Sequence, residues 1–131
     1  MKKVSLVFAL GSLVLSSISF ATECPSQWGN DDFNEKVSAA IKKATDCNDG
    51  VQIAYSCGMG NSNDPIIFSV AEQKCFNTFK KKKTEVALFQ SIASRCEKKY
   101  SNAQGTMYRS FGAACRVEAA KIVANVNSPL E

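Results

Sequence analysis

Hydrophobic residues recur at steps of three and four along most of the chain after residue 32, which is the spacing of one face of an α-helix. The apolar residues of the first such segment are Phe33, Val37, Ala40, Ile41, Ala44, Cys47, Val51, Ala54 and Tyr55. Asp31 or Asp32 is expected to cap this helix, because a short carboxylate can accept a backbone N–H of the first turn. Asn48, Asp49 and Gly50 predict a kink or a split within it, since glycine destabilises a helix interior.

Two further amphipathic segments follow. Asp64 is expected to cap the second segment and Pro65 to occupy its first position, where the missing N–H of proline is not needed. Its apolar stripe consists of Phe68, Ala71, Cys75, Phe79, Val86, Phe89, Ala93, Cys96 and Tyr100. Four consecutive lysines interrupt this stripe, which predicts either one long helix or two helices with a break near Lys82. The third segment begins at Thr106, and its apolar residues are Met107, Tyr108, Phe111, Cys115, Ala119, Ile122 and Val126.

These patterns together predict an all-α fold. No segment combines the alternation of a β-strand with flanking turn residues. The composition, 45% hydrophobic and 21% charged, is that of a globular domain and excludes a disordered or low-complexity chain. We therefore expect a small disulfide-stapled bundle of three or four helices, built from helical hairpins.

The first 21 residues have the features of a secretory signal peptide. Lys2 and Lys3 form a positive end, an uncharged apolar run spans 4–20, and the small residues Ser19 and Ala21 precede the expected cleavage point. An uncleaved membrane anchor is the alternative, but the apolar run is short for a membrane span. The sequence thus predicts a signal peptide over 1–21, a single mature domain over 22–131 without a membrane span, and a periplasmic or secreted location.

Charge and the absence of histidine narrow the possible functions. The chain has 16 basic and 12 acidic residues, and cleavage removes two lysines, leaving 14 and 12, a mature net charge of about +2. That charge is too weak to indicate nucleic-acid binding. Without histidine, imidazole-based catalysis and imidazole metal ligands are excluded. The acidic group Asp31, Asp32 and Glu35 is expected at a helix N-terminus, although two carboxylates could in principle serve a glycosidase. We expect that the protein is not an enzyme, that it has no catalytic residue, and that it binds no metal and no cofactor.

All six cysteines lie in the predicted mature chain, and an even number in a small exported protein predicts three disulfides. The closest two cysteines are ten residues apart, which is not the spacing of a metal or redox motif. Residues equidistant from the turn of an antiparallel helical hairpin lie at the same height, and two cysteine pairs are centred on the turn residues Asn61 and Gly105. The favoured pairing is Cys47–Cys75 and Cys96–Cys115, which leaves Cys24–Cys57. An intervening helix would remove this constraint, so other pairings remain open.

Two further features could contact a partner. Lys80, Lys81, Lys82 and Lys83 form a lysine cluster that has two interpretations. The structural interpretation is a solvated surface or a helix break. The functional interpretation is weak, salt-sensitive binding of an anionic polymer or lipid. Trp28 lies in an arm outside the periodic segments. We expect its ring to pack over the bundle rather than to protrude towards a partner, and we assign the aromatic residues of the helical stripes to the core.

The residues around the last predicted turn resemble a known family. The sequence from Cys96 to Tyr100, then Gly105, Thr106 and Met107, then Cys115, is similar to the LprI-like lysozyme inhibitor family over about residues 90–122. Members are small exported helical proteins in which a cysteine, a Gly-[Ser/Thr]-Met turn and a second cysteine join two long helices. The resemblance implies a hairpin closed by Cys96 and Cys115, and lysozyme inhibition as a possible activity. Leu88, Ile92 and Val123 stand where the family often has Trp or Arg.

The functional hypothesis from the sequence is therefore an exported, non-enzymatic helical protein that binds another protein, with a lysozyme-type muramidase as the most concrete partner. The alternative is an envelope-associated structural or adhesion module that binds an anionic polymer or lipid through the lysine cluster. The candidates for a partner-binding loop are residues 58–64 or residues 101–106. Their candidate contact residues are Asn61, Asn63, Asp64, Gln104 and Thr106.

Overall fold

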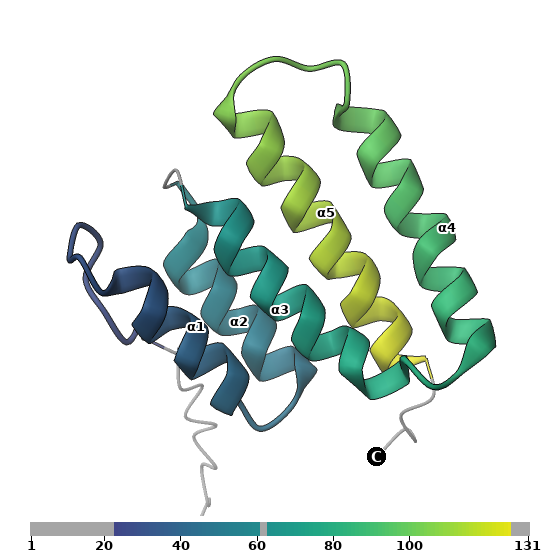
Figure 1. Ribbon diagram of the computed structural model, residues 1–131, viewed down its shortest axis with the longest axis horizontal. Coiled ribbons are helices and arrows are strands. Elements are labelled where there is room, and N and C mark those ends of the chain that lie inside the picture. The colour runs from purple at the N-terminus through teal and green to yellow at the C-terminus, as the bar shows by residue number, and fades with distance from the viewer. Residues whose placement is uncertain (1–22, 61–62, 127–131) are drawn as a thin grey trace, which may run out of the picture.

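The computed structural model describes residues 23–60 and 63–126, and this part of the chain contains five α-helices and no β-strand (Figure 1). The helices are α1 (Phe33–Lys43), α2 (Cys47–Gly58), α3 (Asp64–Phe79), α4 (Lys83–Tyr100) and α5 (Thr106–Asn125). The predicted all-α, disulfide-stapled architecture is confirmed. The predicted number of three or four helices is too small, because two of the amphipathic segments are each divided into two helices. The predicted signal peptide lies outside the described residues.

The first segment divides earlier than the sequence predicts. The chain leaves the helix at Ala44, and Asp46 caps α2 by accepting the backbone N–H of Asp49 at 2.9 Å. Gly50 thus lies in the first turn of α2, where it is buried: a Cβ there would come within 3.3 Å of the Lys74 side chain. The Lys74 ammonium donates hydrogen bonds to the carbonyl oxygens of Ala44 (2.5 Å) and Lys42 (3.1 Å). It thereby supplies donors for carbonyl groups at the C-terminal end of α1, where the helix itself provides none. The expected kink at 48–50 is wrong, since the break precedes it.

The caps of α1 and α3 also differ in detail from the prediction. Asp32 is the N-cap of α1, but its side chain makes no cap hydrogen bond, and its carboxylate instead pairs with Lys36 at 2.7 Å. Asn63 is the N-cap of α3, and Asp64 is the first helical residue, followed by Pro65. The break near Lys82 is confirmed, because α3 ends at Phe79 and Lys82 has an extended backbone before α4 begins.

Helix α3 lies at the centre of the bundle, with α1 and α2 on one side and α5 on the other, and α4 packs along the outer side of α5 (Figure 1). The core between them is formed by buried apolar side chains: Phe33, Val37, Ile41, Val51, Ala54, Ile67, Phe68, Ala71, Phe79, Phe89, Val117, Ala120 and Val123. None of the described helices is long and apolar enough to cross a membrane.

Three disulfides join the elements, in the pairing that the turn positions favour. Their Cα–Cα distances are 5.1 Å for Cys24–Cys57, 4.6 Å for Cys47–Cys75 and 5.7 Å for Cys96–Cys115. They link the N-terminal arm to the end of α2, α2 to α3, and α4 to α5. Such bonds form and persist in oxidising compartments.

A charged contact connects the three C-terminal helices. The guanidinium of Arg116 on α5 donates to both carboxylate oxygens of Glu72 on α3, at 2.9 and 2.7 Å, and also to Glu97 on α4. The hydrogen bonds to Glu72 raise the pKa of Arg116 above its usual range. Because the planar fork matches a carboxylate, this contact fixes the orientation of α5 between its two neighbours.

A second polar contact, between Tyr55 on α2 and Glu118 on α5, makes the stability of the fold change with pH in the alkaline range. Burial, followed by the charge and the hydrogen bond of Glu118, raises the pKa of Tyr55 from 10.0 to about 12. A folded-state pKa above the unfolded value means that folding favours the neutral phenol. This contribution is complete below pH 10 and is lost as the pH rises from 10 towards about 12.

We therefore expect the wild-type protein to lose more stability between pH 9.5 and 11.5 than Tyr55→Phe does, which urea unfolding followed by circular dichroism measures at each pH. Tyr108→Phe is the matched control, because Tyr108 is exposed, and this variant should keep the pH dependence of the wild type. Identical pH dependence of the wild type and Tyr55→Phe would contradict the role of this contact.

Candidate functional site

A groove lies at the end of the bundle where the α2–α3 turn meets the start of α5. It has a volume of about 420 Å³ and is lined by Met59, Gly60, Asp64, Thr106, Met107, Ser110 and Phe111. We call these seven residues the tip groove. Both candidate loops therefore contribute to a single surface.

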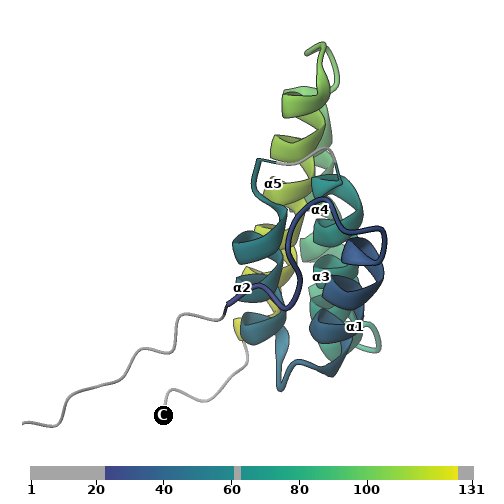
Figure 2. The ribbon, with the colours of Figure 1, turned by 90° about the vertical axis from the view of Figure 1, so that its left-hand side faces the viewer.

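The tip groove exists because α4 and α5 are longer than their neighbours. In both ribbon views the α4–α5 hairpin extends beyond the start of α3 (Figures 1 and 2). The first turns of α5 consequently have no helix covering them on that side. The chain enters them through Gly105, whose φ of 113° lies in the left-handed region that favours glycine.

Exposed apolar side chains surround the groove. The exposed fractions are 55% for Met59, 64% for Met107 and 39% for Phe111, and Tyr108 beside them is 43% exposed. The rings of Tyr108 and Phe111 pack edge to face, with their centroids 6.4 Å apart. Apolar side chains gathered at one place on the surface are typical of a binding site, whereas single exposed ones are not.

A buried carboxylate contributes to the wall of the groove. Asp64 is only 2% exposed, and its Oδ2 accepts the backbone N–H of Gly60 at 3.2 Å. Gly60 has a φ of 93°, so this hydrogen bond holds a turn that other residues adopt with strain. The groove is thus mainly apolar, with a negative charge beside it.

The candidate residues from the sequence are divided among several places. Asp64 and Thr106 line the tip groove, Asn63 lines a smaller pocket beside Trp28, and Gln104 is exposed in the α4–α5 loop. Asn61 lies outside the described residues. The four lysines of the cluster are exposed at the turn between α3 and α4, at the other end of α4 from the tip. They do not form one site with the loops.

Sequence reasoning missed the apolar residues of the tip groove. Met107 and Phe111 belong to the helical stripe of α5, and that stripe was assigned to the core. The length of α5 was a signal for their exposure. This helix begins more than two turns before Cys115, and α3 does not extend far enough to cover those first turns. Trp28 was also expected to pack over the bundle, which is wrong: its side chain is 68% exposed.

The described residues contain no group of three His, Cys, Asp or Glu side chains placed to hold a metal ion. Asp31, Asp32 and Glu35 are all exposed at the start of α1, with Asp32 paired to Lys36. No family model, curated protein or solved structure matches this chain.

Removing the Asp64 carboxylate should weaken the fold. We expect Asp64→Ala to lower the free energy of unfolding by about 1–3 kcal/mol, because the hydrogen bond that the buried Asp64 carboxylate accepts from the Gly60 N–H is lost. Urea unfolding of the variant measures this. Asp31→Ala, at an exposed position, should change the same quantity by less than about 0.5 kcal/mol. Equal effects of the two substitutions would contradict a structural role for Asp64 in the groove wall.

Proposed function

We propose that this chain is an exported, non-enzymatic protein that binds another protein through the tip groove. The observation that carries the proposal is the gathering of Met59, Met107 and Phe111, all exposed, around a hollow of about 420 Å³. Methionine side chains adapt to the shape of a partner, and exposed aromatic rings provide apolar area at low entropic cost. The three disulfides support export, since they fit an oxidising compartment.

The groove favours a partner side chain with an apolar stem and a positive end. The stem of a lysine or arginine would contact the methionines and Phe111, and its charge would be attracted by the Asp64 carboxylate. A basic protein surface supplies such side chains. Lysozyme-type muramidases are cationic, and the resemblance of the last hairpin to LprI-like inhibitors makes them the first partners to test.

The test is titration of the mature, oxidised protein against several lysozymes, with muramidase activity and calorimetric binding as readouts. We expect saturable binding, and we expect Met107→Ala to weaken it by at least about tenfold, because an exposed anchor in an apolar contact is removed. Ile122→Ala is the matched control: Ile122 is 55% exposed on the same helix, but fifteen positions nearer its C-terminal end. No binding at micromolar excess would retire the lysozyme partner, and equal effects of both variants would remove the tip groove from the proposal.

A second candidate function is adhesion to an anionic envelope polymer through the lysine cluster. Because the helix breaks between Phe79 and Lys83, all four lysines are exposed, which a continuous helix would not allow. Lys80 is held by a hydrogen bond to Asn77 at 3.1 Å, and the Lys82 ammonium lies 4.0 Å from the Glu85 carboxylate.

This second candidate predicts salt-dependent binding to lipopolysaccharide or to peptidoglycan. Changing the four lysines to glutamine should abolish that binding while leaving the helical circular dichroism spectrum unchanged, since the side chains are exposed. The control changes Lys98 and Lys99 to glutamine, two exposed lysines at the other end of α4. Binding that survives the first variant, or that is insensitive to salt, would contradict this candidate.

A further inference from the structure

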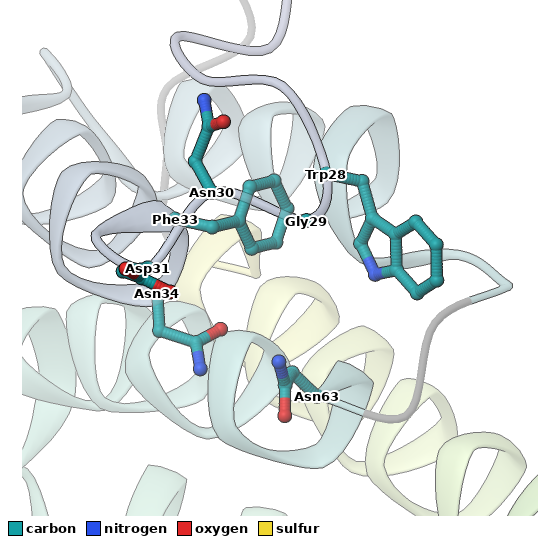
Figure 3. Close-up of a pocket in the computed structure, with 7 residues that line it drawn as sticks. All are labelled: Trp28, Gly29, Asn30, Asp31, Phe33, Asn34 and Asn63. Atoms are coloured by element: carbon teal, nitrogen blue, oxygen red, sulfur yellow. The ribbon is translucent and has the colours of Figure 1, made fainter.

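The N-terminal arm forms a second pocket, separate from the tip groove, around the single tryptophan of the chain (Figure 3). Its volume is about 250 Å³, and the residues that line it are Trp28, Gly29, Asn30, Asp31, Phe33, Asn34 and Asn63. We call it the Trp28 pocket. It shares no lining residue with the tip groove.

The arm that carries Trp28 is held in place. The Cys24–Cys57 disulfide ties the arm to the end of α2, four residues before the tryptophan. The chain then turns at Gly29, whose φ is 96°, and the backbone N–H of Phe33 donates to the carbonyl of Asn30 at 3.0 Å. Phe33 is buried below the turn, with an exposed fraction of 3%. An exposed indole on such an anchored arm needs little ordering when a ligand stacks on it.

Polar side chains face the same opening from two helices. Figure 3 shows the amides of Asn34, from α1, and Asn63, the N-cap of α3, turned toward one another on one side of the opening, with the Phe33 ring and the Trp28 indole on its other side. The Oδ1 atom of Asn34 is buried and accepts no hydrogen bond from the described residues. A buried acceptor without a protein partner is unfavourable, and the broad χ2 preference of asparagine lets this amide turn to meet a ligand.

The chemistry of this lining selects an uncharged, hydroxyl-rich ligand. An amide offers both a donor and an acceptor, as a sugar hydroxyl does, and the negative face of an indole attracts the C–H groups of a pyranose ring. Among the described residues, Asp31 is the one charged residue that lines the pocket; its exposed carboxylate can accept hydrogen bonds from sugar hydroxyls and repels phosphate and carboxylate ligands, and the polar lining disfavours a lipid chain. We propose that the Trp28 pocket binds a neutral sugar unit of a carbohydrate chain.

A neighbouring hollow extends the site along the same turn. It has a volume of about 400 Å³, shares Gly29, Asn30 and Asp31 with the Trp28 pocket, and adds Asp32 and Lys36. The Asp32 and Lys36 side chains form an ion pair at 2.7 Å, so their charges offset one another. Adjacent hollows that share a wall suit consecutive units of an oligosaccharide, and the second lies within the usual size range of small-ligand sites, about 300–1,000 Å³.

Because Trp28 is the only tryptophan, its fluorescence reports directly on this pocket. The mature, oxidised protein is titrated with chitotetraose, cellotetraose and maltotetraose, and with adenosine as an uncharged stacking ligand that is not a sugar chain. We expect at least one tetrasaccharide to change the fluorescence in a saturable way below about 10 mM. Raising the NaCl concentration should change the apparent affinity less than about twofold, because a neutral sugar carries no charge whose attraction salt could screen.

Variants separate binding from folding. Trp28→Ala, followed by calorimetry, should lose at least about tenfold in affinity. Asn34→Ala should lose affinity while the unfolding midpoint stays unchanged or rises, since the variant removes a buried acceptor without a protein partner. Asn102→Ala, at an exposed position in the α4–α5 loop, and Met107→Ala in the tip groove should retain wild-type sugar binding.

The proposal is overturned if no tetrasaccharide binds, if adenosine binds more tightly than all three, if salt abolishes binding, or if Trp28→Ala binds like the wild type. If the wild-type protein binds a tetrasaccharide but no lysozyme, the lysozyme partner is retired and the proposal for the Trp28 pocket stands.

Discussion

The disulfides are the constraint on which the rest of this structure depends. The described part of the chain is small, and a domain of this size buries a smaller fraction of its surface than a larger domain does. Two of the bonds join antiparallel helices within the bundle, where Cys75 and Cys96 are almost completely buried. A cross-link of this kind contributes about 2–4 kcal/mol, mainly by restricting the unfolded chain. The helices can therefore keep their arrangement although several apolar side chains remain in water.

Both proposed surfaces depend on this constraint in the same way. The α4–α5 hairpin extends beyond the rest of the bundle, and Cys96–Cys115 joins its two helices in addition to the contacts of Arg116. The arm that carries Trp28 contains no helix, and the bond from Cys24 to Cys57 attaches it to α2. An exposed apolar side chain on a loosely held segment would lose much entropy on binding. Attachment by covalent bonds reduces that loss, and this favours both proposed surfaces as places for recognition.

The sequence predicts the helices well and the surfaces poorly, for one physical reason. Helical periodicity and the distance of a cysteine from its turn are local properties, so the all-α fold follows from the first, and the second favours the two pairs that close hairpins, Cys47–Cys75 and Cys96–Cys115. Whether an apolar stripe is covered depends on the lengths of helices that are distant in the sequence. The apolar stripe of α5 alone therefore does not show that Met107 is exposed, and Trp28 belongs to no stripe, so periodicity does not place its ring. The break before Cys47 was misplaced for a related reason, because Lys74 on another helix satisfies the carbonyl groups at the end of α1.

Mapping the disulfides of the native protein tests this account most directly. Proteolysis without reduction, followed by mass spectrometry, should give three cross-linked peptide pairs, Cys24 with Cys57, Cys47 with Cys75 and Cys96 with Cys115, and no free thiol. Any other pairing, or a cysteine that reacts with a thiol reagent before reduction, would contradict it, since neither the projecting hairpin nor the tryptophan arm would then be held in place.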